Sequence, residues 1–163
     1  MDIQGFHHVA YRCANAKQTV EFYQQVLGMD FQLAIAEDKV PSTGEPDPYM
    51  HIFMDAGNGN VLAFFELPQS PDMGSDINTP KWVQHIAFKV PDMETLLATK
   101  EHIKNLGIDV LGPIDHTLFQ SIYFFDPNGH RLELAACCGA RLVLSHSSSI
   151  AGATRCNSSN MPG

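Results

Sequence analysis

The chain contains an internal repeat, and this repeat constrains its fold more than any other feature. The segments HHVAYRC at residues 7–13 and QHIAFKV at residues 84–90 match position for position, so His8 corresponds to His85. Each segment begins a similar run of strand, helix and strands. Self-similarity of this kind indicates a duplicated supersecondary unit. We therefore expect two βαβββ modules, at about residues 5–68 and 82–136, in one domain spanning residues 1–136.

The helices of the two modules carry boundary signals at both ends. Asn15 and Asp92 are polar N-cap residues that precede apolar helical patterns, and Gly28 and Gly107 close those patterns. The other expected elements of the first module are a surface loop rich in proline and glycine over 29–48 and strands at 49–54 and 61–67. In the second module they are strands at 121–125 and 130–135, joined by the turn Asp126-Pro127-Asn128-Gly129.

Strand alternation predicts which side chains share a face of each sheet. Glu133 lies between Leu132 and Leu134, so its carboxylate points away from the two leucines. By the same alternation, His8 and His85 lie on the faces opposite the residues that pack on the helices. The first module also ends on a glutamate in an apolar strand, Glu66, which the repeat matches with Glu133. We expect an α+β fold in which the two modules form a curled eight-stranded half-barrel, with two histidines and two glutamates pointing into it.

Composition excludes several function classes. With 10 Lys+Arg against 18 Asp+Glu, the formal net charge is −8, which argues against a nucleic-acid partner. No apolar stretch is long enough for a membrane helix, and we expect a cytoplasmic protein that does not bind membranes. Residues 137–163 are rich in Ser, Ala, Gly and Asn without a sustained period, so we expect a low-complexity tail. Its cysteines lack zinc-site spacing.

The paired βαβββ modules, each with an early histidine and a late glutamate, resemble the vicinal oxygen chelate superfamily. That superfamily includes glyoxalase I, type I extradiol ring-cleavage dioxygenases and bleomycin-binding proteins. The resemblance covers residues 5–136 and implies a divalent metal in the cup, held by His8, His85 and Glu133. Glu66 is either a fourth ligand or a residue that contacts the ligands without binding the metal itself. Two imidazoles and one carboxylate suit Fe(II) and leave sites open, whereas four ligands suit Ni, Zn or Mn.

The stretch from Ile114 to Glu133 is similar to the signature of the extradiol dioxygenases. It contains His116, Tyr123 and the turn at 126–129 at matching places. The resemblance implies that His116 moves protons and that Tyr123 donates a hydrogen bond near the metal. The structural alternatives are a histidine at the pocket rim and an ordinary strand aromatic.

The leading hypothesis is therefore a metal-dependent enzyme, a non-haem Fe(II) dioxygenase that cleaves a small catechol-like substrate with vicinal oxygens. One alternative is a glyoxalase I-like lyase or isomerase using Ni, Zn or Mn. A second alternative is a metal-free binding module of the bleomycin type, although a buried carboxylate without a cation is costly. The linker at residues 68–81 permits pairing of modules within one chain or in a homodimer.

Overall fold

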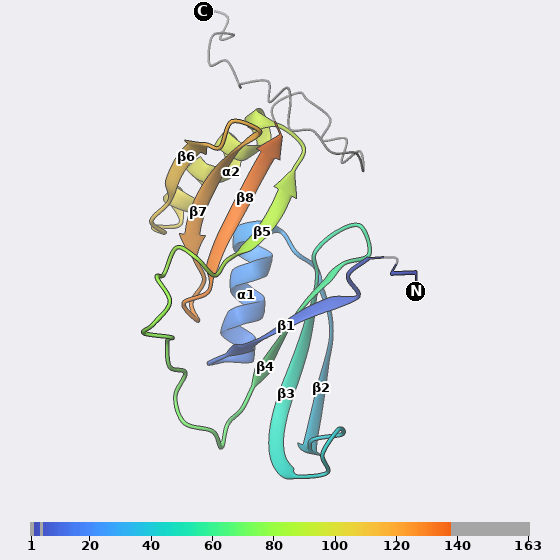
Figure 1. Ribbon diagram of the computed structural model, residues 1–163. Helices are drawn as coiled ribbons and strands as arrows, with labels where there is room; N and C mark the ends of the chain where they lie inside the picture. Colours follow the sequence, from blue (N-terminus) through green and yellow to red (C-terminus); the bar gives the residue numbers. More distant parts are fainter. Residues whose placement is uncertain (1, 4, 138–163) are drawn as a thin grey trace, which may run out of the picture. The chain divides into compact units, whose positions relative to one another are not determined.

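The computed structural model describes residues 2, 3 and 5–137, and Figure 1 shows its elements. The elements run β1 (His8–Cys13), α1 (Ala16–Leu27), β2 (Phe31–Lys39), β3 (Pro46–Asp55), β4 (Val61–Glu66), β5 (Ile86–Val90), α2 (Met93–Asn105), β6 (Leu111–Asp115), β7 (Phe119–Phe125) and β8 (Arg131–Cys137). The predicted α+β fold of two βαβββ modules is confirmed. Each module forms an open four-stranded mixed sheet.

The chain divides into two compact units that only partly follow the repeat. The first unit comprises Met1–Pro80 together with Asp126–His130, the turn between β7 and β8. Among the described residues, the second unit comprises Lys81–Phe125 and Arg131–Cys137. The first unit is therefore built from two segments that are far apart in the sequence.

The first unit packs α1 on one face of a sheet with the strand order β1-β4-β3-β2. β1 and β4 are parallel, while β4, β3 and β2 are antiparallel neighbours. Asn15 caps α1 by accepting a hydrogen bond from the Gln18 amide, and Gly28 ends the helix with φ 64°. Its core lies between helix and sheet, where Tyr23 contacts Phe64 at 5.0 Å between ring centroids.

The turn at 126–130 contributes polar contacts to this core. Asp126 is buried, and its carboxylate accepts hydrogen bonds from the Tyr23 hydroxyl and from the backbone amides of Asn128 and His130. The Asn128 amide group also donates to the Thr19 hydroxyl. Burial, reinforced by the Asp126 carboxylate, raises the pKa of Tyr23, so its hydroxyl keeps its proton.

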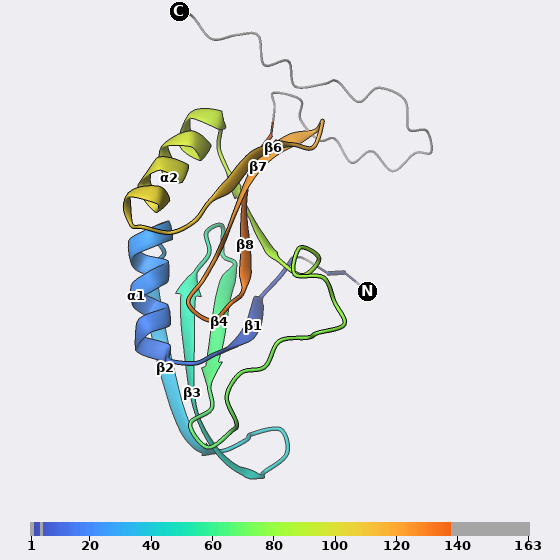
Figure 2. The same ribbon diagram turned by 90° about the vertical axis from the view of Figure 1, so that its left-hand side faces the viewer.

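The second unit repeats the arrangement, with α2 on one face of the sheet β5-β8-β7-β6 (Figure 2). Asp92 caps α2 through the Thr95 amide, and Gly107 follows the helix with φ 78°. The core residues on this face are Leu96, Ile103, Ile122, Phe124, Leu132 and Leu134. The apolar stripes predicted for β7 and β8 therefore pack as expected.

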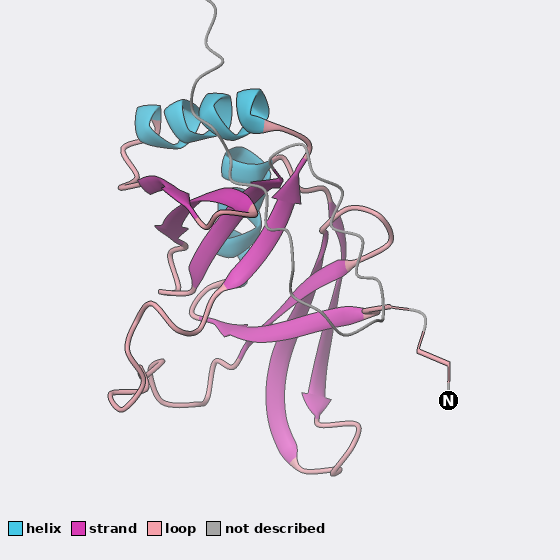
Figure 3. Cartoon of the chain, turned by 45° about the horizontal axis from the view of Figure 1, so that its top comes forward, coloured by secondary structure: helices cyan, strands magenta, loops and turns pink. Residues whose placement is uncertain are grey.

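The expected surface loop at 29–48 is wrong, because this segment contains β2 and the beginning of β3 (Figure 3). β2 is an edge strand and is exposed along its whole length, so it lacks the buried apolar run that marks a central strand. Pro46 and Pro48 lie in the part of β3 that extends beyond β4, where one edge has no partner strand. The alternating residues Leu33 and Ile35 were the signal for β2.

The predicted tail at 137–163 falls outside the described residues except for Cys137, which belongs to β8. None of the helices in the described part of the chain is long and apolar enough to cross a membrane. The cytoplasmic location and the homodimer stay predictions.

Candidate metal centre

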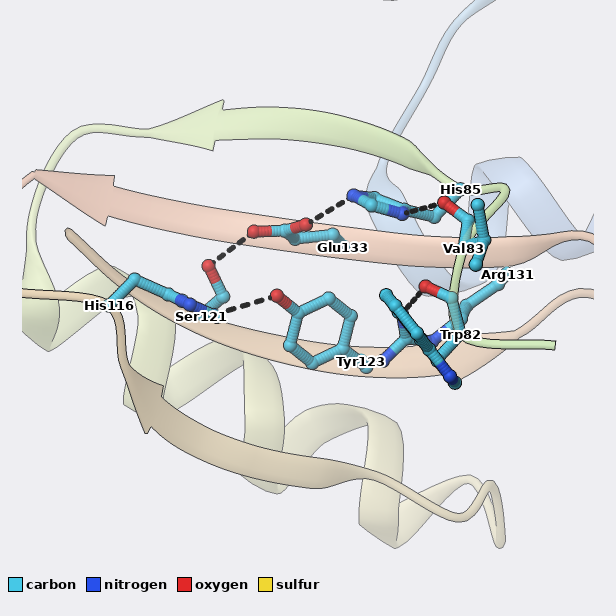
Figure 4. Close-up of polar contacts among 8 residues, drawn as sticks. All are labelled: Trp82, Val83, His85, His116, Ser121, Tyr123, Arg131 and Glu133. Carbon is cyan, nitrogen blue, oxygen red and sulfur yellow. Dashed lines mark hydrogen bonds and ion pairs between the residues drawn. The ribbon is translucent and has the colours of Figure 1, made fainter. Parts of the chain in front are cut away.

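Glu133 is held in β8 with its carboxylate on the face opposite α2. Its neighbours Leu132 and Leu134 are buried on the helix side, as strand alternation requires. Only 4% of Glu133 is exposed. One carboxylate oxygen, Oε1, accepts a 2.5 Å hydrogen bond from the Ser121 hydroxyl, and the other, Oε2, lies 2.9 Å from Nε2 of His85 (Figure 4).

His85 lies just before β5 and directs both ring nitrogens at acceptors. Nδ1 lies 2.9 Å from the Val83 carbonyl oxygen and donates a hydrogen bond to it. Nε2 faces the Glu133 carboxylate, so His85 is either doubly protonated or faces this carboxylate across a cation. A hydrogen bond from Nδ1 to a backbone carbonyl is the support that orients metal-binding histidines. The pair His85 and Glu133 therefore fits a divalent metal.

His116 and Tyr123 form a second polar pair beside Glu133. The Tyr123 hydroxyl and Nε2 of His116 are 2.9 Å apart, and which of them donates depends on the histidine tautomer. Tyr123 is directly opposite Glu133 in the β7–β8 ladder and is 8% exposed. Burial, followed by the negative charge of Glu133, raises the pKa of Tyr123. Tyr123 therefore keeps its proton at neutral pH and can donate a hydrogen bond.

The loop between β6 and β7 positions His116 for this contact. Its backbone amide donates to the Phe119 carbonyl, and its ring stacks on the Phe119 ring at 4.9 Å between centroids. Asp115 accepts a hydrogen bond from the Thr117 amide, and Thr117 has φ 73°. This tight turn directs the exposed His116 back toward β7.

His8 opens β1 in the first unit and lies opposite Val61. Its Nδ1 is 2.8 Å from Nδ1 of His7, an interaction that leaves Nε2 for another partner. His51 lies on the same face, and its ring stacks on Phe65 at 3.6 Å between centroids. Burial lowers the pKa of His51, as does the neighbouring His8.

The structure does not place Glu66 where the repeat suggested. In the second unit Glu133 is opposite Ala87, and the residue that matches Ala87 is Ala10 in β1. Ala10 is opposite Ala63, so Ala63 holds the position that matches Glu133. Glu66 lies three residues further along β4, on the helix side of the sheet. There its Oε2 accepts a 2.6 Å hydrogen bond from the Ala16 amide in the first turn of α1.

Of the four predicted ligands, the structure brings His85 and Glu133 together. Among residues 2, 3 and 5–137, no group of three or more His, Cys, Asp and Glu side chains is arranged to hold a metal ion. The metal-ligand role of His8 stays a prediction. Sequence reasoning missed Ser121 and Arg131, which contact Glu133 and Tyr123. Both could have been found by alternation, since Ser121 lies two residues before Tyr123 and Arg131 two before Glu133.

Comparison with known proteins identifies relatives with different activities. The model of the Glyoxalase/Bleomycin resistance protein/Dioxygenase superfamily matches residues 5–134. A putative ring-cleaving dioxygenase, MhqA of Bacillus subtilis, is 29% identical over 138 residues, which are 83% of this chain. The chain spans 41% of the length of MhqA, less than half. A lactoylglutathione lyase of Pseudomonas aeruginosa is 26% identical over 147 residues, 79% of this chain and 80% of the relative.

Solved structures support the fold. A glyoxylase/bleomycin resistance protein/dioxygenase domain from Frankia sp. EAN1pec superposes with a TM-score of 0.69 at 16% identity. The match covers 86% of this chain and 96% of that domain. At this identity the likeness shows a shared fold and not a shared activity.

Proposed function

Because the chain belongs to the Glyoxalase/Bleomycin resistance protein/Dioxygenase superfamily, we propose that it is a metal-dependent enzyme that cleaves the ring of a small catechol-like substrate. Fe(II) is the preferred metal, with His85, Glu133 and, from the repeat, His8 as its ligands. Members of the superfamily use divalent metals, and the relatives include both a dioxygenase and a lyase. The finer assignment depends on the side chains around Glu133.

The contact between His116 and Tyr123 is the observation that carries this proposal. It supplies a proton acceptor and a hydroxyl donor beside the carboxylate of Glu133. A catechol must lose a proton before its two oxygens bind as a chelate, and an unprotonated imidazole nitrogen can accept that proton. In the tautomer in which Nε2–H of His116 donates to the Tyr123 oxygen, Nδ1 of His116 would take that proton, and the Tyr123 hydroxyl would donate a hydrogen bond to a substrate oxygen.

When bound, the metal would supply Lewis acidity and open positions for the two vicinal oxygens and for O₂. The protein's own contribution is to orient the ligands. Ser121 orients Glu133, and the Val83 carbonyl orients His85. Glu133 and Tyr123 are buried, whereas His116 and His85 are exposed, so the fold shields the carboxylate and the phenol from bulk water and leaves the two imidazoles accessible.

The similarity to the lactoylglutathione lyase supports the glyoxalase I-like alternative, because the match covers 80% of that relative's length. That reading uses a fourth ligand, for which Glu66 was the candidate. Glu66 instead caps α1 at Ala16, and Ala63 holds the position matching Glu133. We therefore prefer three ligands and dioxygenase chemistry. A metal-free binding module would leave Glu133 buried without a metal, and within the described part of the chain its one ion-pair partner is His85, which is charged only when protonated.

The decisive experiment reconstitutes the protein with Fe(II) under anaerobic conditions and then measures oxygen uptake against a panel of catechols. His116→Gln should retain the metal and lose ring cleavage by about 10²–10⁴-fold, the usual contribution of a general base. His102→Gln, on α2 in the same unit, is the matched control and should be as active as wild type. Ring cleavage at the wild-type rate in His116→Gln would remove the main reason for the dioxygenase assignment.

Metal content tests the ligand set independently of turnover. His85→Ala and His8→Ala should each abolish stoichiometric metal binding while circular dichroism shows an intact fold. Glu66→Gln should keep the metal, because its carboxylate contacts the α1 amide. Full occupancy in His8→Ala would restrict the metal site to the second unit.

A further inference from the structure

Arg131 places a fixed positive charge two residues before Glu133 on the same face of β8. We propose that Arg131 binds a carboxylate on the substrate, so that the preferred substrates are catechols that bear an acidic side group. This inference rests on the proposed function for the identity of the substrate and on the surroundings of Arg131 for the anion.

The Arg131 guanidinium is held in place from two sides. One nitrogen, Nη1, donates a 2.7 Å hydrogen bond to the carbonyl of Trp82, which lies shortly before β5. The guanidinium carbon lies 4.0 Å from the centroid of the Tyr123 ring, in a cation–π contact (Figure 4). A half-buried arginine fixed in this way has little rotamer entropy left to lose when an anion binds.

Arg131 has no carboxylate partner within the part of the chain that the structure describes. The ion pairs there join Lys17 to Glu21, His85 to Glu133, and Lys104 to Glu101. The guanidinium of Arg131 has five N–H donors, and the hydrogen bond to Trp82 uses one of them. The remaining donors can bind a planar carboxylate, and two of them can do so in bidentate geometry.

The position of Arg131 relative to Glu133 suits an aromatic substrate. Two residues along a strand correspond to about 6.5–7 Å between Cα atoms, and the guanidinium lies over Tyr123, the residue opposite Glu133. Glu133 is opposite Tyr123, and Arg131 is opposite Phe125, whose side chain is exposed on the same face. A ring whose vicinal oxygens lie beside Glu133 would therefore bring a carboxylate on its side group within reach of Arg131.

Arg131 could instead act only by holding Tyr123, and substrate pairs separate these roles. The substrates are 3,4-dihydroxyphenylacetate and the neutral 4-ethylcatechol. Arg131→Gln should lower kcat/KM for the carboxylate by about 10–100-fold, the scale of a charge-assisted hydrogen bond, and change it little for 4-ethylcatechol. Arg131→Lys should recover part of the loss, and Lys104→Gln on α2 controls for net charge. Equal losses on both substrates would overturn the proposal, because they indicate a role confined to Tyr123.

Binding of phenylacetate separates this inference from ring cleavage, because this ligand has no vicinal oxygens and does not react. Calorimetry on the metal-loaded wild type should show tighter binding of phenylacetate than of benzyl alcohol, and Arg131→Gln should abolish the difference. If no catechol is cleaved but this Arg131-dependent preference is found, the dioxygenase assignment fails and the carboxylate site stands. If wild type has no preference for phenylacetate, the carboxylate site is excluded whatever its activity, and whether or not the variant folds.

Discussion

Glu133 and Glu66 are the same residue type on the matching strands β8 and β4, yet their surroundings give them different roles. Glu133 is buried on the sheet face opposite α2, where it contacts His85 and Ser121. Glu66 lies on the helix face and accepts a hydrogen bond from the first turn of α1. A carboxylate at a helix N-terminus is stabilised by the helix dipole and needs no metal. The face of the strand therefore decides the role of each glutamate.

Ser121→Ala should weaken metal binding by about 10–100-fold, because it removes the hydrogen bond that orients Glu133. The measurement is a competition titration with a metal chelator, accompanied by thermal unfolding of the metal-free protein. Ser70→Ala, in the linker after β4, is the control and should bind metal like wild type. An unchanged dissociation constant in Ser121→Ala would show that Glu133 does not depend on Ser121.

Cys13 should make stability depend on pH in the alkaline range. Burial raises its pKa from 9.0 to about 11, so the folded protein keeps a proton that the unfolded chain loses. The contribution of the buried Cys13 thiol to the free energy of unfolding is fully present below pH 9. It is lost as the pH rises to 11, at up to about 1.4 kcal/mol per pH unit.

Urea unfolding between pH 8 and 10 measures this slope. Cys13→Ala should make the decline between pH 9 and 10 shallower, while Tyr23, whose pKa is also raised from 10.0, contributes only at higher pH. A slope between pH 9 and 10 that is the same in both proteins would contradict the assignment to Cys13.

At the scale of elements, the β6–β7 pair shows how closely two strands can approach. The ladder shifts register between Leu111 and Ile114, and Gly112 lies at this irregularity with φ 105°. A Cβ atom on Gly112 would lie 2.5 Å from the Ser121 carbonyl oxygen. This approach affects the site, since β7 carries Ser121 and Tyr123.

Gly112→Ala should therefore destabilise the protein by about 2–6 kcal/mol, the sum of backbone strain and overpacking. Gly107→Ala is a matched control, because Gly107 has φ 78° but no atom within 4 Å of the added Cβ. That variant should lose only the strain, about 1 kcal/mol. Urea unfolding of both variants checks the difference, and equal losses would show that the close contact with Ser121 costs nothing.

At the scale of the whole molecule, the first unit is assembled from two distant stretches of sequence. Its α1 helix packs on residues of the first repeat and on the turn 126–130 from the second. The hydroxyl of Tyr23 has Asp126 as its partner, so the segment 1–80 alone leaves a buried donor unsatisfied.

Asp126→Ala should lower the free energy of unfolding by about 3–5 kcal/mol, because several buried hydrogen bonds to one carboxylate are lost together. Hydrogen exchange should rise in α1, which Tyr23 anchors. Asp76→Ala removes an exposed carboxylate that also accepts hydrogen bonds from neighbouring residues, and it should have little effect. Unchanged exchange in α1 of Asp126→Ala would show that the turn does not support the helix.

The sequence by itself determined the features that depend on local or repeated patterns. The duplication predicted two βαβββ modules, and the cap residues Asn15 and Asp92 predicted the helix starts, because capping involves amides only three residues away. Strand alternation predicted that the side chain of Glu133 lies on the other face of the sheet from its neighbours Leu132 and Leu134. The conformational preferences of proline and glycine predicted the turn at 126–129.

Only the tertiary structure decided the features that depend on strand register and on distant partners. Composition favours a loop where β2 forms, because an edge strand buries little apolar surface. The register of β1 with β4 separates Glu66 from Ala63, and a shift of three residues reverses the face without changing the composition. The pairing of Tyr23 with Asp126 spans 103 residues, and the position of Arg131 over Tyr123 depends on two strands meeting. Such contacts arise from packing between segments, on which local sequence carries no information.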